Sequence, residues 1–218
     1  MDFEAFIRAN TVVEAPQLVP EIKLHLATEV TPLWHATESY LQQKGIEPPF
    51  WAFAWVGGQA LSRYVLDHPH VVAGLRVLDV GSGGGIVAIA AAMAGAAHVT
   101  ALDIDPMAAA ACRLNAQANA IAGRIVTETA DATIYDLAPF DVVLVGDLCY
   151  ARGTADRLAR HLAKAEAPVL FGDPGGHYLP RDDVRLIASY PVAPCLELET
   201  ESTTTGSVWR MVRRDASE

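Results

Sequence analysis

Residues 77–86 read Val-Leu-Asp-Val-Gly-Ser-Gly-Gly-Gly-Ile, a short apolar run that leads directly into a glycine-rich segment. The apolar run predicts a buried strand, and the glycines predict a sharp turn that opens a helix over Gly85–Ala94. Glycines at such a turn let the backbone approach a ligand that side chains would exclude. The segment therefore predicts the strand, turn and helix of a ligand-binding α/β protein.

From Leu75 to the C-terminus, short apolar strands alternate with helical stretches, which is typical of a mostly parallel sheet with helices on both faces. Cys195–Thr200 and Ser207–Arg213 flank a polar, turn-rich stretch and predict an antiparallel hairpin. The other strands are expected at Leu75–Val80, His98–Asp103, Ile125–Glu128, Phe140–Asp147 and Val169–Gly172, and the other helices at Pro106–Ala120 and Thr154–Lys164. We therefore expect residues 75–218 to form one α/β core.

Residues 1–74 have a different pattern, in which helical pieces are interrupted by prolines. The chain has 218 residues, of which 51% are apolar and 19% charged, so it is long enough for one globular unit and lacks the composition of a disordered protein. We therefore expect residues 1–74 to be an N-terminal helical extension that packs on the core.

Charge and cysteine content exclude several classes of protein. A net charge of −10 repels phosphate backbones and argues against a nucleic-acid partner. Cys112, Cys149 and Cys195 include no closely spaced pair, which argues against a disulfide framework and a cysteine metal site. The longest apolar run, Ile86–Ala97, is too short to span a membrane, and no secretory signal precedes it. These features predict a cytoplasmic protein without a metal or a membrane partner.

The acids near the glycine turn indicate which ligand it binds. A dinucleotide fingerprint would require a glycine at the position of Ile86. Asp79, two residues before the first glycine, would repel a pyrophosphate and suits a cationic ligand instead. Asp103 ends the next strand, about 20 residues further on, where an acidic residue reaches ribose hydroxyls. A ribose and a positive charge are both present in S-adenosylmethionine.

The pattern of Asp79, Gly81, Gly83 and Gly85 resembles motif I of the seven-strand, Rossmann-like methyltransferases. The resemblance implies a seven-strand sheet and an S-adenosylmethionine site formed by these four residues and Asp103. The alternative is a tight turn without a ligand, in which Asp103 only caps the helix that follows.

Two further residues are predicted at the cofactor site. Asp131 follows the third strand, where the acidic residue of this fold meets the adenine amino group; the alternative is an aspartate that caps its own loop. The stretch Phe50–Trp55 places four aromatic rings in six residues. Core packing is the default for such rings, but Trp55, at the turn before a helix, is expected to cover the adenosine.

The fourth strand ends in Gly146-Asp147-Leu148-Cys149-Tyr150, at the edge of the sheet where reacting groups lie. Methyltransferases for planar nitrogens carry two prolines where Leu148 and Cys149 stand. Asp147 and Tyr150 instead resemble the D-x-x-Y motif of seven-strand protein-lysine methyltransferases. The resemblance implies that Asp147 accepts a hydrogen bond from the substrate amine and that Tyr150 supplies a hydroxyl or a ring wall. The alternative for Asp147 is a cap on the following turn.

The whole chain resembles the electron transfer flavoprotein β-subunit lysine methyltransferases. The resemblance rests on the segments at Pro20–Ile22, Pro32–Trp34, Pro49–Leu61, motif I, Asp147–Tyr150 and Gly172–Pro180, although the arginine expected near Gly176 is missing. It implies an S-adenosylmethionine-dependent enzyme that methylates lysines of the flavoprotein β subunit. The absence of a targeting sequence predicts a bacterial member of this family, and we expect a monomer. The alternatives are another protein substrate such as a ribosomal protein, a small amine, a nicotinamide-cofactor oxidoreductase, or a binding module without catalysis.

Overall fold

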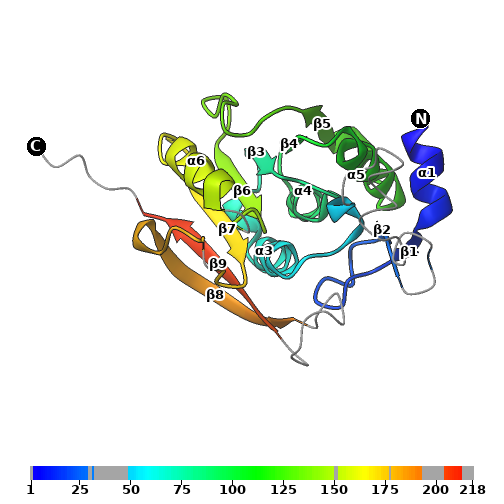
Figure 1. Cartoon of the computed structure of the whole chain (residues 1–218), viewed down its shortest axis with the longest axis horizontal. Coiled ribbons are helices and arrows are strands. Elements are labelled where there is room, and N and C mark those ends of the chain that lie inside the picture. The colour runs from blue at the N-terminus through cyan, green and yellow to red at the C-terminus, as the bar shows by residue number, and fades with distance from the viewer. Residues whose placement is uncertain are drawn as a thin grey trace, which may run out of the picture.

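The structure is a computed structural model that describes residues 2–28, 31, 49–149, 152–176, 178–192 and 204–212. Its main sheet has the strand order β5-β4-β3-β6-β7-β9-β8 (Figure 1). The strands are β3 (Arg76–Val80), β4 (His98–Asp103), β5 (Ile125–Thr129), β6 (Val142–Gly146), β7 (Val169–Asp173), β8 (Val184–Val192) and β9 (Thr204–Met211). The first five are parallel, and β9 pairs antiparallel with both β7 and β8. The predicted fold is confirmed.

The hairpin differs from the prediction in its first strand. β9 pairs with β8, whereas the sequence pattern places the partner at Cys195–Thr200, which lies outside the described residues. Because β8 contains Pro191 and the charged Arg185, the sequence pattern does not predict a strand there. Both are tolerated because β8 is an edge strand, with one row of backbone groups unpaired in the sheet.

Helices cover both faces of the sheet (Figure 1). Buried strand residues alternate between two clusters, so Val77 packs toward α3 and α4 while Leu78 packs toward α6. The α-helices are α1 (Phe3–Asn10), α3 (Val56–Asp67), α4 (Ile86–Met93), α5 (Pro106–Ala118) and α6 (Arg152–Leu162), and short 3₁₀ turns lie at Phe50–Ala52, Pro69–Val71, Ala122–Arg124 and Arg181–Asp183. In the described part of the chain, no helix has the length and apolar character needed to span a bilayer.

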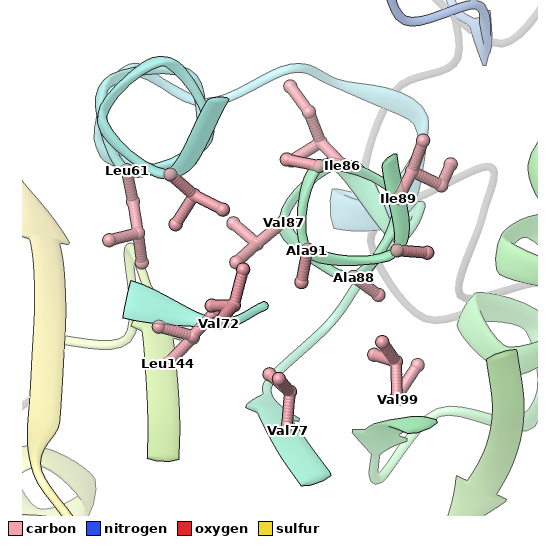
Figure 2. Packing of buried hydrophobic residues seen from close by; sticks show 14 of the residues in the cluster. Leu61, Val72, Val77, Ile86, Val87, Ala88, Ile89, Ala91, Val99 and Leu144 are labelled. Carbon is pink, nitrogen blue, oxygen red and sulfur yellow. The ribbon is translucent and has the colours of Figure 1, made fainter. Parts of the chain in front are cut away.

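The core lies where α4 packs on the sheet. Its alanines let the helix approach closely, and Figure 2 shows Val87 and Ala91 between Leu61 of α3 and the strands. On the sheet side they meet Leu144 and neighbouring strand residues. Because α4 begins at the glycine turn, this packing fixes the position of the turn.

The N-terminal part was expected to be helical, but the structure also contains two strands there. β1 (Val12–Glu14) and β2 (Leu24–Leu26) form a two-stranded antiparallel sheet, which suits their β-branched and alternating apolar residues. Ile7 of α1 packs with Leu114 of α5. A domain boundary at Leu75 stays a prediction. The helix α3 precedes this position, and it packs against β6, β7 and β9 of the main sheet.

Candidate active site

The glycine turn between β3 and α4 lies at the carboxyl end of the parallel strands. Gly81, Gly83 and Gly85 have φ values of 66°, 51° and 83°, in the left-handed region. At Gly85, which caps α4, a Cβ atom would also overlap the sulfur of Cys112. Only glycine fits there, because both the backbone angle and the close helix–helix contact exclude a side chain.

Asp79 and Ser82 are the buried polar groups of this turn. Asp79 is 1% exposed, and its Oδ2 accepts a hydrogen bond from the Ala88 N–H of α4 at 2.9 Å. Burial, with a smaller contribution from the charge of Asp103, raises the pKa of Asp79 to about 7. The Oγ atom of Ser82 is buried and has no hydrogen-bond partner among the described residues. The turn therefore offers a carboxylate and a hydroxyl to a polar ligand.

Asp103 holds the turn from the next strand. Its Oδ2 accepts from the Gly83 N–H at 2.8 Å, and its Oδ1 accepts from the Asp105 N–H at 3.0 Å. Burial raises the pKa of Asp103. The alternative role as a helix cap is wrong, because Asp105 caps α5 by accepting from the Met107 N–H at 2.8 Å.

Asp131 caps its own loop after β5. One carboxylate oxygen accepts from both the N–H and the hydroxyl of Thr133, each at 2.8 Å, and these bonds hold the pKa of Asp131 below its usual range. The loop-cap alternative therefore describes the contacts of this side chain. Its contact with adenine stays a prediction.

Asp147 occupies the start of α3. Its carboxylate accepts from the Gly57 N–H at 2.9 Å and also from the Gly58 N–H, while the N-cap residue Trp55 makes no side-chain cap. Asp147 has φ 52°, and its own N–H donates to the Gly172 carbonyl at 2.9 Å. The predicted alternative was a cap on the turn after its own strand. The bonds to Gly57 and Gly58 cap a helix that lies about 90 residues earlier in the chain, and a cap on the following turn stays an alternative.

The aromatic rings divide between the core and the site. Trp51 is buried against α5, whereas Trp55 is partly exposed and donates its indole N–H to the Phe50 carbonyl at 2.8 Å. The rings of Phe53 and Trp55 are tilted, with centroids 5.7 Å apart. Trp55 thus lines the same pocket as the glycine turn. Its contact with adenosine stays a prediction.

These elements line one pocket. It joins the glycine turn, the aromatic stretch and the end of β6, and it is lined by Leu24, Phe50, Trp51, Phe53, Trp55, Gly58, Asp79, Gly81–Gly84, Ile86, Val87, Gly146 and Asp147. Asp79 and Asp147 therefore face a common space, with the glycine backbone between them.

Comparison with known proteins identifies the family. Residues 59–149 match the family model for ribosomal protein L11 methyltransferase (PrmA). The human electron transfer flavoprotein β-subunit lysine methyltransferase is 36% identical over 218 residues, which cover 95% of this chain and 81% of the human protein. The mouse protein of the same name is 37% identical over 216 residues, covering 94% and 83%. The chain belongs to the family of electron transfer flavoprotein β-subunit lysine methyltransferases.

As a member of this lysine methyltransferase family, the chain is an S-adenosylmethionine-dependent methyltransferase, and the resemblance seen in the sequence is confirmed. The fold agrees with solved methyltransferases. Magnesium protoporphyrin IX methyltransferase from Synechocystis, solved with S-adenosylmethionine, superposes with a TM-score of 0.53 at 17% identity, covering 71% of this chain and 76% of that one. The oxidoreductase alternative is therefore set aside.

The pocket of this lysine methyltransferase family member fits the cofactor. S-adenosylmethionine carries a positive charge and polar groups. The pocket holds the buried Asp79 carboxylate, the Ser82 hydroxyl, which has no partner among the described residues, and a glycine-rich backbone turn. Those groups are the partners that a cationic, polar ligand requires when it is buried.

Some site residues are not placed and others were missed. Tyr150 lies outside the described residues. Gly57 and Gly58 were not predicted as partners of Asp147, although a helix that begins without a Ser, Thr, Asp or Asn cap signals that the cap comes from elsewhere. No arginine adjoins Gly176, but the guanidinium of Arg181 donates to the neighbouring Gly175 carbonyl. Asn115, which donates to the Gly84 carbonyl, was also missed.

Proposed function

We propose that this chain is a protein-lysine methyltransferase whose substrate is the electron transfer flavoprotein β subunit. The observation that carries the proposal is the Asp147 carboxylate, which is held at the start of α3 in the same pocket as Asp79 and the glycine turn. The names of its vertebrate relatives support the same substrate.

We assign roles to the predicted site residues, some of which line the pocket, as follows. The cofactor would be held by Asp79, Gly81, Gly83, Gly85 and Asp103, with Asp131 and Trp55 on the adenosine side. Asp147 and Tyr150 would serve the substrate lysine. The cofactor supplies an activated methyl group on a sulfonium when it is bound. The remaining steps are the loss of a proton from the substrate ammonium and the orientation of the resulting amine by Asp147.

A lysine ε-ammonium has a pKa of about 10.4 in water and no free lone pair, so it must lose a proton before it can accept a methyl group. Burial in a pocket beside another positive charge lowers this pKa. Asp147 would then accept a hydrogen bond from the neutral amine and direct its lone pair. The carboxylate has about four acceptor positions, so it can bind an amine while it accepts from Gly57 and Gly58.

Asp147 is well held for this role. Two backbone N–H donors and the positive end of the α3 dipole stabilise its negative charge and fix its orientation. A fixed acceptor lowers the entropic cost of orienting the amine. The same carboxylate is too weak a base to remove the proton from an ammonium in water, which is why its role is orientation.

The substrate is tested with a radiolabelled methyl donor. The purified chain is incubated separately with electron transfer flavoprotein, with ribosomal protein L11 and with free lysine, and the labelled residue is located by mass spectrometry. Label on lysines of the flavoprotein β subunit is the expected result. Label confined to the ribosomal protein or to free lysine would replace the proposed substrate. A bacterial source, a cytoplasmic location, a monomeric state and the absence of nucleic-acid or membrane partners stay predictions.

Cofactor affinity should rise with pH through the titration of Asp79. Below pH 7 the folded protein holds this carboxyl largely protonated, and above pH 7 it is largely charged. A positively charged cofactor binds the charged form better, so we expect an affinity gain of about tenfold between pH 6 and pH 8. Calorimetric titration with S-adenosylmethionine across this range measures the gain.

Asp79→Asn provides the control for that titration. An asparagine keeps an oxygen that can accept from the Ala88 N–H, but it carries no charge. Titration of the cofactor is common to both proteins, so the difference in slope isolates Asp79 together with the part of the Asp103 titration that is coupled to it. Equal slopes in the two proteins would exclude Asp79 as the group that faces the positive charge.

A further inference from the structure

Asn115 of α5 and Asn119, the C-cap residue of the same helix, hold the backbone of the N-terminal segment. Asn119 accepts from the Lys23 N–H at 2.9 Å and donates to the Lys23 carbonyl at 2.7 Å. One helical turn earlier, Asn115 accepts from the His25 N–H at 2.7 Å. Lys23 directly precedes β2 and His25 lies within it, so the two asparagines fasten the start of β2 to the C-terminal end of α5.

Asn115 differs from Asn119 because it also reaches the glycine turn. Its Nδ2 donates to the Gly84 carbonyl at 2.8 Å, while its Oδ1 lies 2.9 Å from the Nδ1 atom of His25. Asn115 is 0% exposed and His25 is 6% exposed. Since the amide nitrogen faces Gly84, the amide oxygen accepts from His25, whose Nδ1 must therefore carry a proton.

Gly84 is tightly enclosed on this side of the turn. A Cβ atom there would lie 2.7 Å from the Trp51 carbonyl oxygen and 3.3 Å from the Asn115 amide nitrogen. Asp103 holds the adjacent Gly83 N–H. The turn is thus held by two hydrogen bonds from β4, through Asp103 and the Leu102 carbonyl, and by one from α5. Its other side lines the pocket together with Leu24 of β2.

We propose that Asn115 is a positioning residue for the cofactor turn and that it couples the docking of β2 on α5 to the affinity for S-adenosylmethionine. This rests on the proposed cofactor site. One buried amide satisfies the Gly84 carbonyl, the His25 backbone and the His25 ring, so its removal frees the turn and the strand together. Because such coupling is reciprocal, cofactor binding also strengthens the attachment of β2.

The test compares Asn115→Ala with Asn119→Ala. Both variants lose an asparagine that fastens the N-terminal segment to α5, but only the first loses the bond to Gly84. By calorimetry with S-adenosylhomocysteine, we expect Asn115→Ala to bind about tenfold more weakly or worse, because the part-buried Gly84 carbonyl loses its donor from Asn115. We expect Asn119→Ala to stay within about threefold of the wild type. At saturating cofactor, kcat of Asn115→Ala should remain within about twofold of the wild type.

Hydrogen exchange gives a readout independent of activity. In the wild type, S-adenosylhomocysteine should slow exchange of the amides at residues 23–27, and in Asn115→Ala this protection should be lost. If Asn115→Ala does not fold, Asn115→Leu takes its place, since it keeps nearly the same volume and shape and has no donor for Gly84. Equal affinities for the position-115 and position-119 variants overturn the proposal. A wild type that binds no S-adenosylhomocysteine overturns the cofactor site itself.

Discussion

Replacing Asp147 with asparagine should slow methyl transfer by about 100-fold or more, whereas the affinity for S-adenosylhomocysteine should stay within about threefold of the wild type. The asparagine has nearly the same volume, so the pocket keeps its shape. Its amide group has one acceptor oxygen to meet two N–H donors, from Gly57 and Gly58, and none is left for the substrate amine. Initial rates at saturating substrate and calorimetric titration of the product cofactor measure the two quantities.

The same substitution should also lower the melting temperature, because Asp147 caps α3. Loss of a hydrogen bond to a charged group costs about 1.5–3 kcal/mol, and each kcal/mol shifts the melting temperature by about 2–4 °C in a chain of this size. Asp2→Ala is the matched control, since Asp2 caps α1 by accepting from the Ala5 N–H, and α1 is not among the elements that line the pocket. It should lose stability but keep its rate. A normal rate for Asp147→Asn would refute the role of Asp147 in transfer.

The cofactor half of the site could be predicted because its signals are local. A buried strand, a glycine turn and the following helix occupy residues 77–94, and each leaves a pattern that short-range rules can interpret. Asp79 is the second-last residue of β3 and Asp103 the last residue of the neighbouring parallel strand β4, so the topology alone brings them to the same edge. No long-range packing has to be known to place them together.

The substrate half depends on packing that the sequence does not display. Asp147 could be placed at a strand end, but its partners Gly57 and Gly58 reach it only because α3 lies against β7. Asn115 is likewise an ordinary polar residue of a helix in the sequence. Its role arises because β2 and the glycine turn, which are distant in the sequence, both form hydrogen bonds with it.

The edge strand β8 was missed for a different reason. Its residues do not alternate strictly between apolar and polar, and Leu186 remains about half exposed. A register irregularity between Leu186 and Ala188 shifts which side chains face the core, so a period of two fails across the strand. Residues 204–206, which the polar pattern of Glu201–Gly206 places in the hairpin turn, belong to β9.

Replacing Gly172 with alanine should reduce the free energy of unfolding by more than about 4 kcal/mol, the range in which overpacking cannot relax. A Cβ atom at this position would overlap the Gly57 carbonyl and lie 2.7 Å from the Cβ of Leu61. Both neighbours belong to α3, and one is backbone, so no side-chain rotation relieves the overlap. The helix must move away from β7, and the N–H donors of Asp147 move with it. Urea denaturation measures the loss of stability.

Gly123→Ala is the control for this effect, because a Cβ atom at Gly123 would meet no atom within 4 Å among the described residues. It should change the free energy of unfolding by no more than about 0.5 kcal/mol. If Gly172→Ala retains enough folded protein to assay, its methyl transfer should fall further than its folded fraction does, since the shift of α3 also displaces Asp147. Equal stability of the two alanine variants would show that α3 and β7 are not in backbone contact, and the placement of Asp147 at the start of α3 would fail with it.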